Sequence, residues 1–234
     1  MRKMLFLTAA LAALSTQGAQ DSARIQWKPK AGDTATYSIQ VAVSMQGMNV
    51  EIGLRSTSKV LELTADTVKL EVTQQMVELK QNGENMADLI PPNTSKTIYT
   101  VRRDGEIFLL CTTYGQGMEQ PRLEEVFRFI YPNREVKLGE TWTRTRTADK
   151  DKGTLASKTM FTFLGSEDLD GAPTHKVKMS FTETEGSTPM TFEATVWLSS
   201  ENGDMLKMDG LLRNVPFDPT MPPADATIKV SRVK

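Results

Sequence analysis

Residues 34–45, TATYSIQVAVSM, alternate strictly between two kinds of side chain, and this pattern limits the fold more than any other feature of the chain. The odd positions carry Ala, Tyr, Ile, Val, Val and Met, whereas the even positions are almost all Thr, Ser or Gln. Alternation with a period of two is typical of a β-strand with one buried and one solvated face. Parallel strands buried on both faces have continuous apolar runs instead, so the stretch predicts an antiparallel sheet.

Two further strand-like runs change phase along their length. The run 50–63 begins with apolar residues at even positions and ends with them at odd positions. The run 68–79 makes the same kind of change across the residues TQQM. A phase change inside a strand indicates a β-bulge, which bends the strand and increases its twist. The chain is therefore expected to form a strongly curved antiparallel sheet or half-barrel.

Dipeptides that tolerate positive φ separate the strand-like runs. Asp-Gly at 104–105 and Asn-Gly at 202–203 each lie between two apolar runs, which predicts β-hairpins. Asn-Gly at 82–83, Asp-Gly at 170–171 and Glu-Gly at 185–186 are further candidate turns.

The segment 121–131, PRLEEVFRFIY, does not alternate and instead has helical spacing. Its apolar residues on one helical face are Leu123, Val126, Phe127, Ile130 and Tyr131. Pro121 suits a first helical turn, and Pro132 ends the run. The segment predicts one amphipathic helix of about three turns that packs its apolar face on the sheet.

The phrase Gly-acid-Thr-x-Thr occurs twice, in AGDTATY at 31–37 and in LGETWTR at 138–144. One interpretation is a single β-rich domain, 21–234, that contains two related units, 26–115 and 134–234, joined by the helix. The alternative is that Gly-acid-Thr is simply a common way to turn into a strand.

Residues 1–20 have the order of a secretory signal peptide: a basic start, a short apolar run and a small polar end. The alternative is an anchor that stays uncleaved. No other stretch is apolar over a membrane-spanning length, so the mature chain is expected to be exported, to the periplasm or the extracellular space, without a transmembrane segment. Cys111 is the single cysteine, which excludes a disulfide within the chain.

Charge and motifs exclude several classes of function. The formal net charge is −1, and no Lys/Arg cluster interleaves with aromatic residues, so nucleic acid is not an expected partner. The chain has one histidine, His175, and lacks G-x-S-x-G, C-x-x-C and H-E-x-x-H. We therefore expect no catalytic residue, no metal site and no cofactor, and we take the chain not to be an enzyme.

Several phrases resemble those of exported bacterial envelope proteins. They are W-x-P-x-x-G-D-x-x-x-Y from Trp27 to Tyr37, VKLGETW at 136–142, VWLSSENGDMLK at 196–207 and NVPF at 214–217. More distantly, the chain is similar to the lipoprotein-carrier (LolA/LolB-like) half-barrel superfamily. That resemblance implies a curved antiparallel sheet that wraps helices and an apolar groove that binds acyl chains.

These observations predict a non-catalytic protein of the cell envelope that binds an acyl chain or another apolar ligand between sheet and helix. The candidate groove residues are Val126, Phe127, Ile130, Trp142, Phe161 and Phe163. An alternative is an interaction or structural module that binds an envelope protein through a sheet edge or an exposed patch. A more distant alternative is a hydrolase that uses His175.

Overall fold

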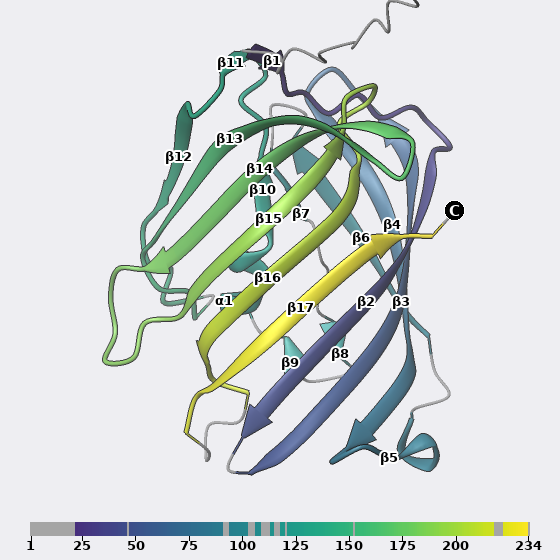
Figure 1. Cartoon of the computed structure of the whole chain (residues 1–234), viewed down its shortest axis with the longest axis vertical. Helices are drawn as coiled ribbons and strands as arrows, with labels where there is room; N and C mark the ends of the chain where they lie inside the picture. Colours follow the sequence, from purple (N-terminus) through teal and green to yellow (C-terminus); the bar gives the residue numbers. More distant parts are fainter. Residues whose placement is uncertain are drawn as a thin grey trace, which may run out of the picture.

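The computed structural model describes residues 22–45, 47–90, 94–102, 106–108, 113–114, 118–119, 121–151, 153–217 and 222–233, and almost all of its regular structure is β-strand (Figure 1). The first strands are β1 (Ser22–Arg24), β2 (Thr34–Met45), β3 (Met48–Leu63), β4 (Thr67–Gln81), β5 (Glu84–Asn85), β6 (Ser95–Arg102), β7 (Glu106–Phe108), β8 (Thr113–Tyr114) and β9 (Met118–Glu119). The others are β10 (Arg128–Ile130), β11 (Glu135–Lys137), β12 (Thr141–Arg146), β13 (Ser157–Leu169), β14 (Ala172–Glu183), β15 (Thr191–Ser199), β16 (Met205–Val215) and β17 (Ala224–Arg232). A single turn of 3-10 helix, η1 (Ala87–Leu89), and a short helix, α1 (Pro121–Val126), complete the described elements.

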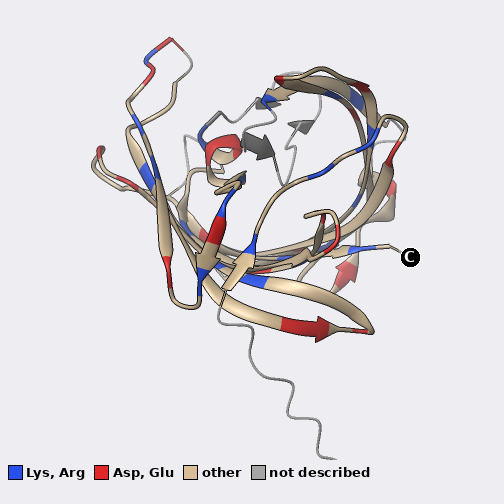
Figure 2. Ribbon diagram, turned by 90° about the horizontal axis from the view of Figure 1, so that it is seen from above, with Lys and Arg blue, Asp and Glu red and all other residues tan. Residues whose placement is uncertain are grey.

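Most strands belong to one sheet of 13 strands in the order β10-β7-β6-β4-β3-β2-β17-β16-β15-β14-β13-β12, with β5 on the side of β4. Every neighbouring pair is antiparallel. Two meanders, β2 to β7 and β12 to β17, are joined where β17 pairs with β2. From above, the sheet curves around an interior (Figure 2). The prediction of a mainly β fold with a strongly curved antiparallel sheet is confirmed.

The predicted alternation and the predicted bulges are both present. In β2 the inward residues Ile39 and Val43 are 2% and 5% exposed, whereas the even positions from Ser38 to Ser44 are exposed. The pairing of β3 with β4 shifts register at two places, between Gly53 and Leu54 and between Val60 and Glu62. These shifts lie where the sequence changes phase, because an extra residue moves every later side chain to the other face.

The turn dipeptides occupy the expected places. Asp170 and Gly171 have φ of 53° and 84° and join β13 to β14, and Asn82 and Gly83 join β4 to β5 in the same way. Gly203, with φ of 78°, lies in the connection from β15 to β16. The dipeptide 104–105 lies outside the described residues, although the flanking strands β6 and β7 pair antiparallel.

The repeated Gly-acid-Thr phrase forms the same turn twice. The backbone N–H of Lys30 donates to the Asp33 carboxylate at 2.7 Å, and the N–H of Asp33 donates to the Lys30 carbonyl at 3.1 Å. Lys137 and Glu140 make the same two bonds, both at 2.9 Å. One turn leads into β2 and the other into β12. The interpretation as two related units stays a prediction.

The helix is shorter than predicted. It begins at Pro121 as expected, but it ends at Val126, and residues 128–130 form strand β10 instead, which pairs with β7. The prediction of a helix over 121–131 is therefore wrong in its second half. Phe127, Phe129 and Tyr131 also alternate with a period of two, and all three are at most 2% exposed. Burial of these aromatic side chains as a strand outweighs the helical spacing.

Helix α1 carries a buried carboxylate that is surrounded by cations. Glu125 is 4% exposed, and its oxygens lie 2.9 Å from Arg144, 3.2 Å from Arg146 and 3.3 Å from Arg128. Because Arg144 and Arg146 belong to β12, this cluster ties the helix to the far end of the sheet. In the described residues, no helix has the length and apolar character needed to cross a membrane.

The core consists of two separate apolar clusters. The larger lies between the C-terminal meander, β2 and the segment of α1 and β10, and includes Phe127, Phe129, Phe161 and Phe192. The smaller lies on β3, β4 and β6, and its buried members are Val60, Val68, Leu70, Val72 and Val101. Trp27 packs against both clusters.

Candidate functional site

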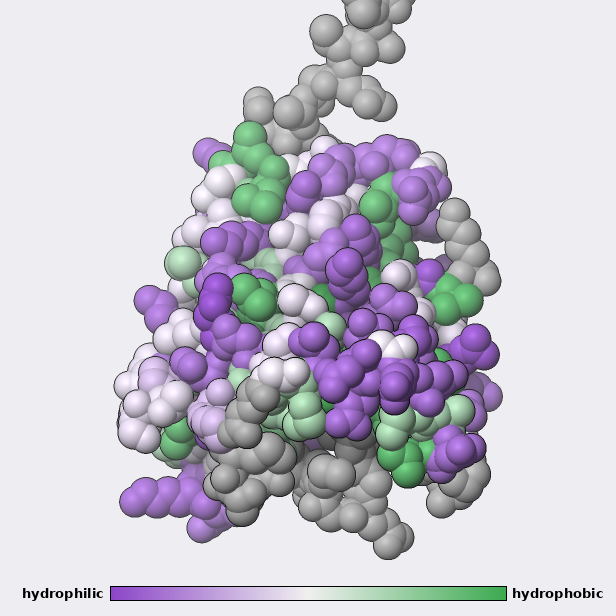
Figure 3. Space-filling view, turned by 60° about the horizontal axis from the view of Figure 1, so that its bottom comes forward, coloured by the Kyte–Doolittle hydropathy of each residue, from purple (hydrophilic) through white to green (hydrophobic). Residues whose placement is uncertain are grey.

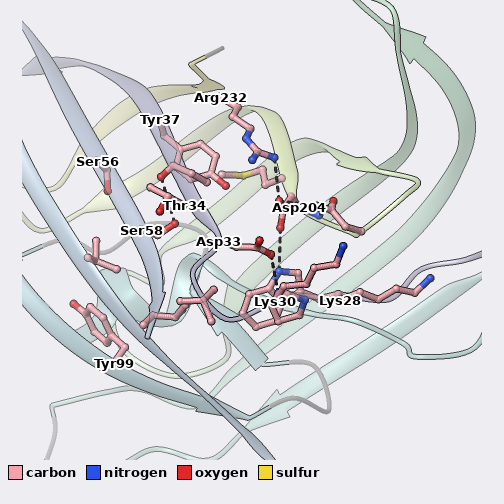
Figure 4. A pocket seen from close by; sticks show the side chains of 18 of the residues that line it. Lys28, Lys30, Asp33, Thr34, Tyr37, Ser56, Ser58, Tyr99, Asp204 and Arg232 are labelled. Atoms are coloured by element: carbon pink, nitrogen blue, oxygen red, sulfur yellow. Dashed lines mark hydrogen bonds and ion pairs between the residues drawn. The ribbon is translucent and has the colours of Figure 1, made fainter. Parts of the chain in front are cut away.

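A cavity of about 200 Å³ lies at one end of the curved sheet, under the segment 25–33, which we call the strap (Figure 4). The strap leads from β1 to β2 and crosses the upper end of the interior (Figure 2). One end is fixed where the N–H of Lys28 donates to the Asn202 carbonyl at 2.8 Å. The other end is fixed where the N–H of Gly32 donates to the Val60 carbonyl at 2.9 Å. The cavity is therefore bounded by the strap, the β15–β16 connection and the inner face of the sheet.

Asp204 connects the parts of this boundary. Its carboxylate accepts hydrogen bonds from the Trp27 indole at 3.1 Å and from the Asn202 amide at 2.9 Å, and it forms an ion pair with Arg232 at 3.0 Å. Beside it, the hydroxyl of the buried Tyr131 donates to the Gly203 carbonyl at 2.7 Å. The strap, the β15–β16 connection and β17 are thus held together by one acid and its three partners.

The apolar part of the cavity wall comes from the smaller core cluster. Val60 on β3, Leu70 and Val72 on β4 and Tyr99 on β6 all line the cavity. The three aliphatic residues are buried, and Tyr99 packs against them. This wall can hold the apolar part of a ligand.

Next to this wall, a row of polar side chains crosses the inner face of the sheet. Arg232, Tyr37, Ser56, Gln74 and Ser95 are successive register partners on β17, β2, β3, β4 and β6. We call these five residues the polar row. Arg232, Tyr37 and Ser56 line the cavity directly. The row separates the two apolar clusters, so it lies where a continuous core would otherwise form.

Three members of the polar row have polar groups without a protein partner. Ser56 and Gln74 are each 7% exposed. In the part of the chain that the structure describes, the Ser56 hydroxyl, the Gln74 side-chain amide and the Tyr37 hydroxyl make no hydrogen bond. Burial raises the pKa of the Tyr37 phenol, and the negative charge of Asp204 raises it further, so this group stays protonated. None of these groups is among the fully shielded, unpartnered side-chain atoms of the described residues, so solvent or a ligand can reach each of them.

The outer rim of the cavity carries charges of both signs. Lys28 and Lys30 are exposed on the strap, and Asp33 and Glu201 are exposed close by. Arg232 is already paired with Asp204. The cavity lining as a whole therefore has three cationic and three acidic residues.

The six predicted groove residues lie in the larger core cluster or against it, and none lines this cavity. Val126, Phe127, Phe161 and Phe163 are at most 1% exposed. Ile130 and Trp142 are partly buried, and the Trp142 indole donates to the Ile130 carbonyl at 2.8 Å. Trp142 also stacks on Phe161 with ring centroids 5.5 Å apart. The structure brings most of these residues together, but as packed core between the sheet and the α1–β10 segment.

The residues considered for catalysis lie elsewhere. The His175 imidazole is 2.9 Å from the Ser166 hydroxyl and is buried beside Phe163, and neither His175 nor Ser166 lines the cavity. Burial lowers the pKa of His175. In the described residues, no group of three or more His, Cys, Asp or Glu side chains could hold a metal ion. Cys111 and the predicted signal peptide lie outside the described residues.

Sequence reasoning missed the cavity, although its signals were present. The phrase from Trp27 to Tyr37 carries a resemblance to envelope proteins, and its residues Trp27, Pro29, Asp33 and Tyr37 all line the cavity. Ser56 continues the inward phase of Val50, Ile52 and Leu54, where another apolar residue would be expected. A small polar residue on the apolar face of a strand was the signal that could have located the site.

Comparison with known proteins gives structural similarities alone. No family model matches the chain, and no curated protein matches it. A solved structure from Bacteroides fragilis, described as an exported protein with a YmcC-like fold, has a TM-score of 0.38 and 10% identity, over 90% of this chain and 100% of that chain. The hypothetical lipoprotein YmcC from Escherichia coli has a TM-score of 0.34 and 15% identity, over 88% of this chain and 90% of that chain.

A DUF1329 family protein from Desulfovibrio piger has a TM-score of 0.23 and 7% identity, over 87% of this chain and 85% of that chain. The resemblance to the lipoprotein carriers stays a prediction.

Proposed function

We propose that the chain is an exported, non-catalytic protein of the cell envelope that binds an amphiphilic ligand in the cavity under the strap. The observation that carries the proposal is the cavity itself: about 200 Å³, with an apolar wall on one side and polar side chains on the other. Ligand sites are typically concave, with apolar walls and a few polar groups that fix the orientation of the ligand. Export is inferred from the leader-like residues 1–20.

This proposal moves the ligand from the place that the sequence predicted. The space between the sheet and the α1–β10 segment is occupied by packed aromatic side chains, such as Phe129 and Phe161 with ring centroids 4.9 Å apart. The cavity lies instead between the sheet and the strap. An acyl chain or a similar apolar group remains the proposed tail of the ligand.

The test is native mass spectrometry of the mature chain, purified without detergent from the envelope in which it is made, followed by organic extraction. The cavity can be filled by Ala35→Phe, because Ala35 lines it. Ala42→Phe is the matched control, because Ala42 lies on the exposed face of the same strand.

We expect the wild type and Ala42→Phe to carry an extractable amphiphile at fixed stoichiometry and Ala35→Phe to carry none. A bare mass for the wild type, with no amphiphile in the extract, would contradict the proposal. An equal load on all three proteins would place the ligand outside the cavity. An unchanged load of amphiphile on His175→Ala would agree with a binding function that needs no catalytic histidine.

A second candidate function is binding of a protein partner at the sheet edge. Strand β12 ends the sheet on one side, and Leu138, Met160 and Leu164 near it are 49%, 41% and 43% exposed. Edge strands can accept an added strand from a partner. On the face shown in Figure 3, hydrophobic residues form separate groups among hydrophilic ones, which favours contact through an edge over contact through a broad apolar patch. A bare wild-type mass together with a co-purifying protein would favour this candidate.

A further inference from the structure

Two uncharged members of the polar row, Tyr37 and Ser56, line the cavity. Ser56 is 7% exposed, whereas Lys28 and Lys30 are exposed on the strap. A ligand whose polar end stayed at the rim would leave the Tyr37 and Ser56 hydroxyls facing its apolar tail. That arrangement is unfavourable, because buried polar groups need hydrogen-bond partners.

The charges around the cavity do not favour a ligand of either sign. Arg232 is the cation nearest in register to Tyr37, and its guanidinium is paired at 3.0 Å with Asp204. An anionic ligand would have to compete with Asp204 for Arg232. At the rim, Lys28 and Lys30 are balanced by acidic residues, and a charged group moved inside the cavity would lose its hydration without gaining a free counter-ion.

Apart from Arg232, which is paired with Asp204, the members of the row that line the cavity are neutral. The Tyr37 and Ser56 hydroxyls can each donate and accept a hydrogen bond. Hydroxyl, ester and amide groups of a ligand complement this set. The apolar wall of Val60, Leu70 and Val72 begins within two register positions of Ser56, so a tail attached to such a group can lie directly on it.

We propose that the cavity selects an uncharged amphiphile, in which a neutral hydroxyl-, ester- or amide-bearing group binds the Tyr37 and Ser56 hydroxyls and an apolar chain lies against Val60, Leu70, Val72 and Tyr99. This inference rests on the proposed function and specifies the ligand class of the same cavity.

The experiment compares three probes with equal chains and different heads: monodecanoylglycerol, decanoate and decyltrimethylammonium. Binding to the mature protein is measured by isothermal titration calorimetry below the micellar concentration of each probe. The test variant combines Tyr37→Phe with Ser56→Ala and removes both hydroxyls that line the cavity. The control variant combines Ser38→Ala with Gln75→Leu, two exposed positions on β2 and β4.

We expect monodecanoylglycerol to bind the wild type and the control at least about tenfold more tightly than either charged probe, because two neutral hydrogen bonds are gained. The test variant should lose about tenfold in affinity for this probe. It should also unfold at about the same urea concentration as the wild type without ligand, because the hydroxyls that it removes bond no described residue. A purely structural role for the row predicts a loss of stability instead.

Tighter binding of decanoate or of decyltrimethylammonium would overturn the inference and leave the proposed function standing. Wild-type affinity of the test variant for monodecanoylglycerol would do the same. Binding of none of the three probes would contradict the proposed function as well.

Discussion

A Cβ atom added to Gly203 would lie 2.2 Å from the carbonyl oxygen of Gln26. The β15–β16 connection and the strap therefore touch backbone to backbone, with no room for a side chain. This close approach brings Asp204 within reach of Trp27 and sets one boundary of the cavity.

Gly203→Ala should destabilise the protein by about 2 kcal/mol or more, because the left-handed backbone alone costs about 1–2 kcal/mol and the methyl group displaces the strap. The measurement is the midpoint of urea unfolding, provided that the dependence of the unfolding free energy on urea concentration is the same for the variant and the wild type. Gly171→Ala is the matched control, because Gly171 has φ of 84° and nothing within 4 Å of the added Cβ. Equal losses for both variants would show that the strap contact adds nothing.

Glu125→Gln should cost about 3–5 kcal/mol, because it removes the charge of a buried carboxylate that lies among three guanidinium groups. Thermal or urea unfolding measures the loss. The control is Glu193→Gln, which breaks the exposed pair with Lys178 and should cost less than about 1 kcal/mol. A loss at Glu125 as small as that at Glu193 would mean that the cluster does not hold helix α1 to the sheet.

Acid should destabilise the protein through His175. Burial lowers the pKa of His175 below its ordinary value of 6.5, so the unfolded chain binds a proton more readily than the folded chain. The contribution of His175 to stability is therefore fully present above pH 6.5 and is lost as the pH falls through the lower folded pKa. His175→Gln should reduce the loss of stability as the pH falls.

His175 is the sole histidine, so one imidazole resonance in an NMR titration reports its pKa directly. A folded pKa at or above 6.5 would contradict the expectation.

Alkali should destabilise the protein through Tyr131, which is 2% exposed. Burial raises the pKa of its phenol well above the ordinary value of 10.0, and the charge of Asp204 raises it further. Above pH 10 the unfolded chain loses this proton before the folded chain does, so stability falls as the pH rises. The measurement is the urea midpoint as a function of pH.

Tyr131→Phe separates the two roles of this residue. It should lower stability at neutral pH by about 1 kcal/mol, because the hydrogen bond to the Gly203 carbonyl is lost. It should also make the stability of the protein decrease less steeply as the pH rises above 10. An unchanged slope would assign the alkaline fall to other groups, such as Tyr37, whose pKa is raised as well.

The sheet could be predicted because each strand shows which of its faces is buried through the order of its own apolar and polar residues. The alternation in β2 and the phase changes in β3 and β4 are both visible in the sequence in this way. The end of helix α1 could not be predicted in this way. Phe127 and Tyr131 fit both a helical face and one side of a strand, whereas Phe129 fits the strand alone. The choice depends on pairing with β7, which lies earlier in the chain.

The cavity could not be predicted because it depends on contacts between distant segments. Trp27 and Asp204, or Tyr37 and Arg232, come together only through the curvature of the sheet and the β17–β2 pairing. The predicted groove residues are aromatic or apolar, and residues that fill a core have the same properties. Ser56 lines the cavity, but a single polar residue in a strand is usually assigned to the solvated face of that strand.

The pairing of β17 with β2 has a consequence for the order of folding. Arg232 and Tyr37 are neighbours in the polar row, although nearly the whole described chain separates them in sequence. Each meander can form its hairpins from local contacts, but the row is complete only after this last, least local pairing. A molecule stopped before that step would have most of its strands and no complete binding site. A ligand of the cavity would therefore bind only the molecule in which β17 is paired with β2, and by mass action it would stabilise the junction between the meanders more than either meander by itself.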